Sequence, residues 1–300
     1  MAVFLAELPA GGQWDFGGRE YGLEPLVLPP PGDPTEPADE NSWTERVRVC
    51  RQLEAVLDNP RSVSLEAPPD DLVYWFRWIT GHQVSFVLWR LIAQTLADLE
   101  SGRVSPEAAS TTLAGHINGC SVMLLYTGSC PPDIYHAVIR ASMRLHHPAF
   151  SGTWAPDYGP VRALFRRSMT VGEPDGPVAR AVRTNQLMHA GVAAALVPDG
   201  PSLLQACGLD GSSDLRQLQA IYDCYFLTLR ARTTQGSMVA QLLRRLTAIV
   251  QDLDVFGLRP GLLDEPGFGT PGIRQLADDS GRILAGVATA VAEPRPRRRR

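Results

Sequence analysis

The sequence predicts an all-α protein, and three observations carry that prediction. Apolar residues recur at helical spacing over long stretches, and no segment alternates apolar and polar residues like a strand. Proline and glycine mark the starts and ends of these stretches, as at Ser105-Pro106 and Pro131-Pro132. With 44% hydrophobic and 20% charged residues, a chain of 300 residues can bury a large core.

The first elements follow a stretch rich in proline and glycine. Residues 1–42 are predicted to form an extended arm that lies on the domain or on a partner subunit. Ser42, with Glu45 three positions later, forms a capping box for a helix that ends near Leu57. The longest predicted helix covers residues 71–99. It is apolar on nearly every side of its first turns, which is typical of a helix in the centre of a core.

The remaining helices are predicted between later proline and glycine signals. They cover residues 107–126, 133–145, 161–169, 177–197, 214–232 and 237–256. A loop rich in glycine, proline and aromatic residues runs from His147 to Pro160. The helical domain is therefore expected to span residues 43–258. Residues 259–300 are predicted to be an irregular tail, and we interpret its terminal arginine run as a solvated end.

Composition and motifs argue against several classes of protein. The net charge is −4, so no overall basic field attracts nucleic acid. No uncharged apolar run reaches the roughly 18 residues of a membrane span, and the N-terminus lacks the basic start of a signal peptide. The five cysteines are scattered without a CxxC pair, which favours free thiols in a reducing cytoplasm. Motifs of hydrolases, kinases and dinucleotide-binding proteins are missing.

Two histidines have unusual surroundings. His82 lies in the middle of the most apolar helix, where an imidazole must find a partner or stay neutral. From the residues alone, it is either a core histidine bonded to a backbone carbonyl or a functional group. His189 is followed by small residues, Ala190, Gly191 and 193–195. They leave a flat surface on which a large cofactor or a neighbouring helix could pack.

Three stretches resemble known haem enzymes. Residues 79–83, ITGHQ, followed by Leu88-Trp89, resemble the distal-histidine helix of tryptophan 2,3-dioxygenases. Residues 144–152, RLHHPAFSG, begin 62 positions after His82 and resemble a second motif of those enzymes. The wider run over 143–165 resembles the haem-dependent L-tyrosine 3-hydroxylases of bacterial antibiotic pathways, which are relatives of the dioxygenases. The resemblance covers most of residues 43–258.

The resemblance implies a helical bundle of the tryptophan 2,3-dioxygenase kind and a haem b cofactor. It implies that His189 binds the iron as proximal ligand and that His82 acts on the distal side as a base. The expected reaction is hydroxylation of L-tyrosine at the ring 3-position to L-DOPA in a secondary-metabolite pathway. The oxidant is either hydrogen peroxide or dioxygen with a reductant.

The resemblance also implies residues that bind the substrate. Arg144 would pair with the amino-acid carboxylate, with Arg140 and Arg162 as alternatives beside the same loop. The side chains expected to line the pocket are Phe150, Ser151, Trp154 and Tyr158, and His146 and His147 lie next to them. We expect a cytoplasmic homo-oligomer that assembles through the N-terminal arm, as the dioxygenases do.

Several alternatives remain open at this point. One is a haem dioxygenase that opens an indole ring, and another is a non-enzymatic haem sensor that needs His189 but not Arg144. A third is a helical interaction module without any cofactor. His116 and Cys120 match an HxxxC pattern through which one branch of the hydroxylases attaches haem covalently, although a buried thiol one turn from a histidine has the same spacing.

Overall fold

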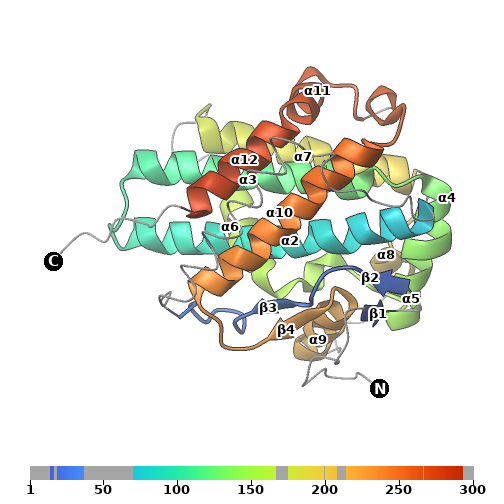
Figure 1. The fold of residues 1–300 in the computed structure, drawn as a ribbon, viewed down its shortest axis with the longest axis horizontal. Helices are drawn as coiled ribbons and strands as arrows, with labels where there is room; N and C mark the ends of the chain where they lie inside the picture. The colour runs from blue at the N-terminus through green and yellow to red at the C-terminus, as the bar shows by residue number, and fades with distance from the viewer. Residues whose placement is uncertain are drawn as a thin grey trace.

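A computed structural model of the chain describes residues 14–16, 19–36, 70–166, 175–198, 200–207, 214–265 and 267–292. The described part is a stack of helices with four very short strands, so the all-α prediction is confirmed (Figure 1). The helix predicted over 42–57 and the terminal arginine run lie outside the described residues.

Three long helices form the centre of the fold. Helix α2 (Asp70–Glu100) packs on α3 (Pro106–Gly128), and α3 packs on α7 (Pro177–Leu196) (Figure 1). Glycines allow these close approaches. A Cβ at Gly128 would lie 2.6 Å from the side chain of Val192, so the contact between α3 and α7 has no room for a larger residue.

Helix α10 (Gln235–Phe256) crosses α2 and is tied to it by a buried ion pair (Figure 1). The Arg77 guanidinium donates to both carboxylate oxygens of Asp252, at 2.8 and 3.2 Å, and both side chains are almost fully buried. Removing one partner of such a pair leaves an uncompensated buried charge, which costs about 3 to 5 kcal/mol. The pair therefore fixes α10 against α2.

The stretch from residue 259 contradicts the prediction of an irregular tail. It contains the short turn η5 (Leu262–Asp264) and two helices, α11 (Pro271–Asp278) and α12 (Ser280–Ala292), which pack on α3. Among the proline and glycine residues that suggested irregularity, Pro271 begins α11 and Gly261 adopts the left-handed conformation before η5. Apolar residues at helical spacing, Leu284, Val287 and Val291, are buried and explain why this segment folds.

The segment predicted as one helix over 133–145 is helical throughout but not uniform. It consists of α4 (Pro132–Ile134), the π-helical turn η2 (Tyr135–Arg140) and α5 (Ala141–His146). Two single turns, η3 (Gly152–Trp154) and η4 (Pro156–Tyr158), follow in the aromatic loop. Helix α6 (Gly159–Arg166) ends this region, and α8 (Leu203–Cys207) follows α7.

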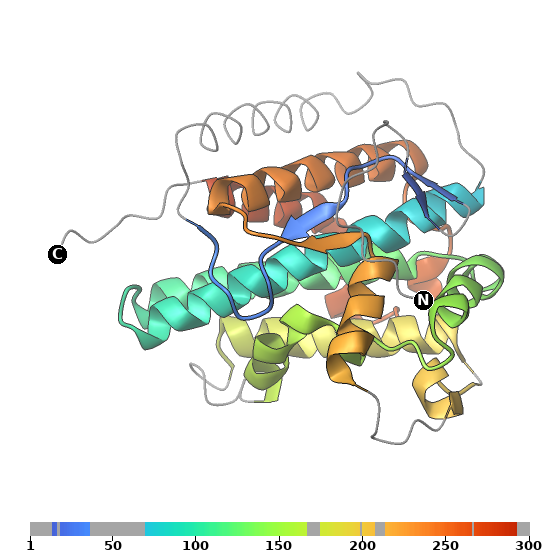
Figure 2. The ribbon, with the colours of Figure 1, turned by 90° about the horizontal axis from the view of Figure 1, so that it is seen from below.

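The strands join the N-terminal segment to the domain. Strand β3 (Leu26–Leu28) pairs in parallel with β4 (Thr228–Arg230), while β1 (Trp14–Phe16) and β2 (Arg19–Tyr21) form a small antiparallel pair. Figure 2 shows β3 and β4 side by side next to α10. On the edge of β3 that faces away from β4, the Val27 backbone exchanges two hydrogen bonds with the Gln241 side chain of α10, at 2.7 and 3.1 Å.

This pairing also shortens one predicted helix. The helix expected over 214–232 ends at Tyr225 as α9 (Leu215–Tyr225). Leu227 then has a positive φ of 48° and turns the chain into β4. Leu26 and Leu28 of β3 are fully buried beside this strand. The gain from tertiary pairing therefore outweighs the local helical preference of residues 226–232.

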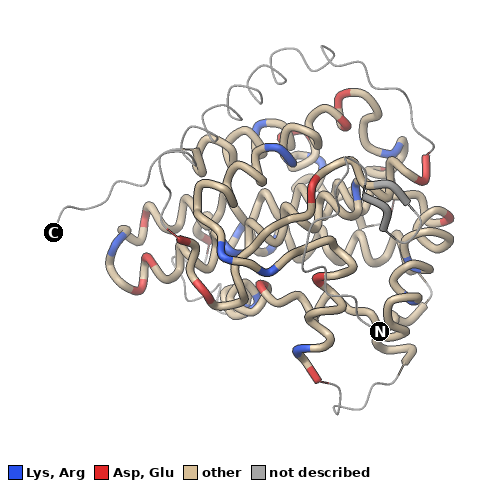
Figure 3. Tube along the Cα trace, turned by 60° about the horizontal axis from the view of Figure 1, so that its bottom comes forward, with Lys and Arg blue, Asp and Glu red and all other residues tan. Residues whose placement is uncertain are grey.

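Acidic and basic residues are interspersed over the described trace, and many form ion pairs between elements (Figure 3). No helix in the described part of the chain is long and apolar enough to cross a membrane.

Candidate functional site

A cavity in two adjoining compartments lies between α2, α3, α7 and α9. The compartments measure about 700 and 430 Å³, within the usual range for sites that bind small molecules or cofactors. Residues that line both compartments make them parts of one space. They are His82, Leu124, Thr127, Ser151, Gly152, His189, Ser202 and Tyr222.

His82 presents a hydrogen-bond acceptor to this cavity. Its Nδ1 lies 2.7 Å from the carbonyl oxygen of Trp78, and because a carbonyl only accepts, Nδ1 carries the hydrogen. Nε2 is then left with its lone pair. Burial lowers the pKa of His82 to about 4, against a smaller opposing effect of the Trp78 hydrogen bond. The imidazole is therefore neutral at pH 7, and it both bonds to a carbonyl and lines the cavity.

The ring of His82 is covered on one face by Phe226. The two rings stack with centroids 4.4 Å apart and an angle of 18° between their planes. Gln83, the next residue on α2, fixes this cover because its Nε2 donates to the Phe226 carbonyl at 2.8 Å. The Gln83 oxygen accepts from the Tyr21 hydroxyl at 2.9 Å and from Arg245 Nε at 2.8 Å. Gln83 and these three partners are all buried, so the orientation of His82 depends on a rigid polar network.

His189 lines the same two compartments from α7. Desolvation lowers its pKa, so this imidazole is also neutral at pH 7, the form that binds a metal ion. Among the described residues, no hydrogen bond or ion pair engages its ring. Asn185, one turn earlier, lines the larger compartment and donates to Ser121 at 3.0 Å. The structure thus brings the two sequence-predicted histidines to one cavity.

The cavity residues fit the haem that the resemblance implies. A haem needs an axial ligand and a roomy apolar space between helices. His189 offers a neutral, unengaged nitrogen, and Ala193, one turn later on α7, adds a small side chain to the same wall. The apolar part of the wall is formed by Met123, Leu124, Phe165, Val192 and Leu196. The backbone of Gly191 approaches that of Gly267, where a Cβ would come within 2.9 Å of the carbonyl oxygen, and this contact fixes α7 beside the cavity.

The HxxxC pair is divided between two cavities. Cys120 lines the larger compartment, and burial raises the pKa of its thiol to about 12, so it is a thiol and not a thiolate. His116, one turn earlier on α3, lines a separate cavity of about 190 Å³. The structure therefore does not bring both residues of this motif to one site.

The predicted substrate residues divide in a similar way. Ser151 lines both compartments, Phe150 lines the smaller one and Tyr158 the larger one. Trp154 is buried beneath them, with its ring 5.7 Å from that of Phe150, and lines neither. Arg144 is exposed on α5 and also lines neither compartment. Its two alternatives do: Arg140 lines the smaller compartment and Arg162 the larger.

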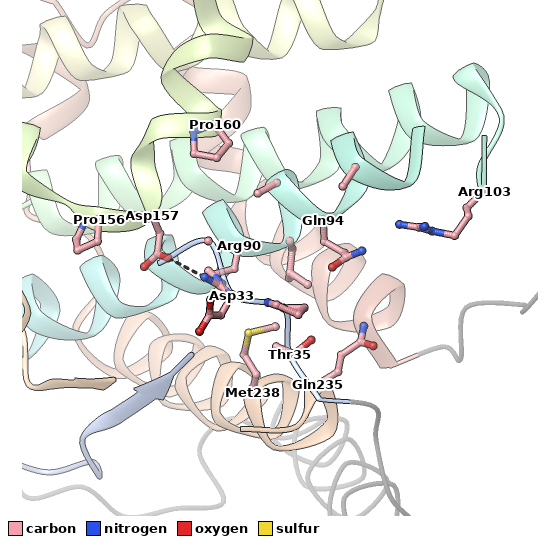
Figure 4. Close-up of a pocket in the computed structure, with 15 residues that line it drawn as sticks. Asp33, Thr35, Arg90, Gln94, Arg103, Pro156, Asp157, Pro160, Gln235 and Met238 are labelled. Atoms are coloured by element: carbon pink, nitrogen blue, oxygen red, sulfur yellow. Dashed lines mark hydrogen bonds and ion pairs between the residues drawn. The ribbon is translucent and has the colours of Figure 1, made fainter. Parts of the chain in front are cut away.

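The aromatic loop that carries these residues is anchored by a cluster of arginines and aspartates. Asp157 is buried and accepts from Arg90 at 3.2 Å and from Arg230 at 2.8 Å. Arg230 also donates to both oxygens of Asp223, at 2.7 and 2.8 Å. Figure 4 shows the Arg90–Asp157 contact at the wall of a further cavity of about 340 Å³. Because Tyr158 follows Asp157 directly, the cluster fixes the loop at the edge of the main cavity.

Among the cavity residues that sequence reasoning did not single out are two aromatic ones, Tyr222 and Phe226. Both belong to an aromatic run, YDCYF, at the end of α9, and their rings lie 4.8 Å apart. Their spacing of four residues places them on one helix face, a signal that could have been read. That this face meets His82 depends on packing between segments more than 140 residues apart and has no local signature.

Comparison with known protein families places the chain in a class of enzymes, the oxidoreductases. A peroxygenase family model matches residues 32–182, half of the chain. The protein belongs to the SfmD 3-methyl-L-tyrosine peroxygenase family. Comparison with curated proteins finds no match. The matched residues include His82 and the aromatic loop but end before His189 and Tyr222. The predicted enzyme class is confirmed at this level.

Proposed function

We propose that the protein is a haem-dependent peroxygenase that hydroxylates L-tyrosine at the ring carbon next to the phenol hydroxyl, giving L-DOPA. The observation that carries this proposal is that His82 and His189, neutral imidazoles from α2 and α7, line one cavity. Membership of a peroxygenase family favours hydrogen peroxide over dioxygen with a reductant. In the balanced reaction, one peroxide oxygen enters a C–H bond of the ring and the other leaves as water.

In this proposal the two histidines have different tasks. His189 holds the iron through its unengaged ring nitrogen, and the bound haem supplies activation of the peroxide. His82 accepts the hydrogen bond of the phenol hydroxyl at Nε2 and takes its proton as the ring is attacked, because its Nδ1 hydrogen is already donated to the Trp78 carbonyl. Removing this proton raises the electron density at the ring carbon that is hydroxylated. Phe226 and Gln83 keep the acceptor nitrogen in place.

Arg162 is our choice for the residue that holds the amino-acid carboxylate, in place of Arg144. It is half-buried and lines the larger compartment, with its guanidinium 5.4 Å from the centre of the Tyr158 ring. Its hydrogen bond to the Thr153 carbonyl, at 3.4 Å, is long and occupies only one of its five N–H donors. The others are available for a bidentate pair with a carboxylate.

Replacing Arg162 by leucine is expected to weaken L-tyrosine binding by about 100-fold, since losing a buried partner of a carboxylate costs a few kcal/mol. Arg144→Leu is the matched control and should bind tyrosine like the wild type. Affinities for tyramine, which lacks the carboxylate, separate charge pairing from general damage: wild type should strongly prefer tyrosine, and Arg162→Leu should lose that preference. A lost preference in Arg144→Leu instead would return the role to Arg144.

The reaction itself is tested with purified haem-loaded protein, L-tyrosine and ¹⁸O-labelled hydrogen peroxide. The expected product is L-DOPA that carries one labelled oxygen, identified by mass spectrometry. Parallel reactions contain 3-methyl-L-tyrosine or L-tryptophan. Turnover of 3-methyl-L-tyrosine alone would move the substrate to the methylated phenol, and a ring-opened tryptophan product would replace the proposal by dioxygenase chemistry.

A further inference from the structure

Tyr222 occupies a central place in the cavity wall, although neither the sequence patterns nor the family match assign it a role. Its side chain is 2% exposed. Like His82 and His189, it lines both compartments. Its ring lies 4.8 Å from that of Phe226, which in turn stacks on His82. On its other side it stacks on Phe150, 5.5 Å away. The phenol ring is thus fixed by aromatic contacts close to the proposed base.

The hydroxyl of Tyr222 has no hydrogen-bond partner among the described residues. Two other buried tyrosines differ in this respect: Tyr21 bonds to Gln83 and Thr80, and Tyr225 bonds to Ser142 at 3.0 Å. Because Tyr222 lines both compartments, a ligand in the cavity is placed to be the partner of this hydroxyl. Burial, together with the neighbouring Asp223 and Tyr225, raises the pKa of Tyr222, so its hydroxyl stays protonated and able to donate.

A substrate phenol bound against His82 would need such a donor. When the phenol O–H bond breaks and its hydrogen bonds to Nε2 of His82, the electron pair stays on the phenol oxygen. Negative charge that develops in a cavity of low polarity is stabilised by a fixed hydrogen-bond donor. Neutral His82 has no hydrogen for the phenol oxygen, because its one hydrogen is held by the Trp78 carbonyl, and after the transfer it holds only the proton that it took from the phenol.

We infer that Tyr222 donates a hydrogen bond to the phenol oxygen of the substrate while His82 takes the phenol proton. The inference rests on the proposed function, because it assigns a role toward the same substrate. Tyr222 keeps its own proton throughout, so the only proton transferred is the one that moves from substrate to His82. The pair distinguishes phenols from aromatic amino acids without a hydroxyl, such as phenylalanine, which would leave both polar groups unpaired.

The test is the Tyr222→Phe variant, which keeps the ring and removes only the hydroxyl. Its kcat with L-tyrosine is expected to fall by about 10²- to 10³-fold, as for loss of one donor to a developing oxyanion. The matched control is Tyr225→Phe on the same helix, whose hydroxyl bonds to Ser142 and which lines neither compartment. That variant should react like the wild type.

Ring-fluorinated tyrosines provide a readout that a packing defect would not change. Their phenols are more acidic, so they depend less on a donor, and the deficit of Tyr222→Phe should shrink as phenol acidity rises. Binding measured by calorimetry gives a second readout without turnover. The ratio of the affinities for tyrosine and phenylalanine should be about tenfold smaller in Tyr222→Phe than in the wild type.

The outcomes separate this inference from the proposed function. If wild type hydroxylates tyrosine and Tyr222→Phe equals it across the fluorinated series, the inference about Tyr222 is wrong and the function stands. A deficit that is the same for every phenol assigns Tyr222 a packing role and also overturns the inference. If wild type neither binds nor hydroxylates tyrosine, both fail.

Discussion

Alanine in place of His189 is expected to give a folded protein that no longer retains haem. His189 offers a neutral nitrogen with no partner among the described residues, and it lines both compartments of the main cavity. Removing it takes away the proposed bond to iron, while the helix that carries it gains a better helix former. Haem content is measured by acid–acetone extraction and by the Soret band after reconstitution.

A control variant and a rescue experiment strengthen this test. His146→Ala removes another histidine, one that bonds to the Ser142 carbonyl and lines neither compartment, and should keep its haem. Free imidazole added to His189→Ala should restore part of the Soret band by replacing the missing ligand. An unchanged spectrum in His189→Ala would show that the iron is bound elsewhere.

The His82→Ala variant is expected to keep its haem but to hydroxylate tyrosine about 10²- to 10⁴-fold more slowly, the usual contribution of a general base. The pH dependence of the wild type provides an independent check. With a pKa of about 4, His82 keeps its lone pair as the pH falls from 7 to 5 and loses it only near pH 4. kcat/KM should therefore stay level down to about pH 5 and then fall.

Two results would contradict this role for His82. A decline of kcat/KM centred on pH 6.5, absent in His82→Ala, would mean that the imidazole titrates as if solvated and is not buried at the site. Loss of haem from His82→Ala, with the rate per remaining haem unchanged, would make His82 an iron ligand and not a base.

Much of the fold could be predicted from the sequence because its signals are local. The limits of the long helices are marked within a few residues. Pro106 after Ser105 marks the start of α3, Pro177 marks the start of α7, and the apolar run that ends before Glu100 marks the extent of α2. The strand pairing could not be predicted in this way. Residues 26–28 contain only three strand-like positions, and their partner lies about 200 residues later, so only tertiary contacts select that pairing.

The site shows the same division between local and long-range information. His82 and His189 could be singled out because each is unusual among its sequence neighbours, and both line the cavity. Which arginine reaches that cavity is decided by the face that its helix presents. Arg144 and Arg162 lie on either side of the same loop. The sequence around them does not show that Arg144 is exposed and that Arg162 lines the cavity.

The parallel pairing of β3 with β4 has a consequence for how the chain is made. Leu26 leaves the ribosome early, but its partner Thr228 follows about 200 residues later, a delay of roughly 10 to 40 s at usual rates of synthesis. Gln83 waits for the Phe226 carbonyl, 143 residues later in the chain, for about 7 to 29 s at the same rates. During that interval the apolar β3 segment and the polar groups around His82 lack their final partners. The nascent chain is therefore most open to chaperone binding and to aggregation just before residues 226–230 are made and the proposed active site is complete.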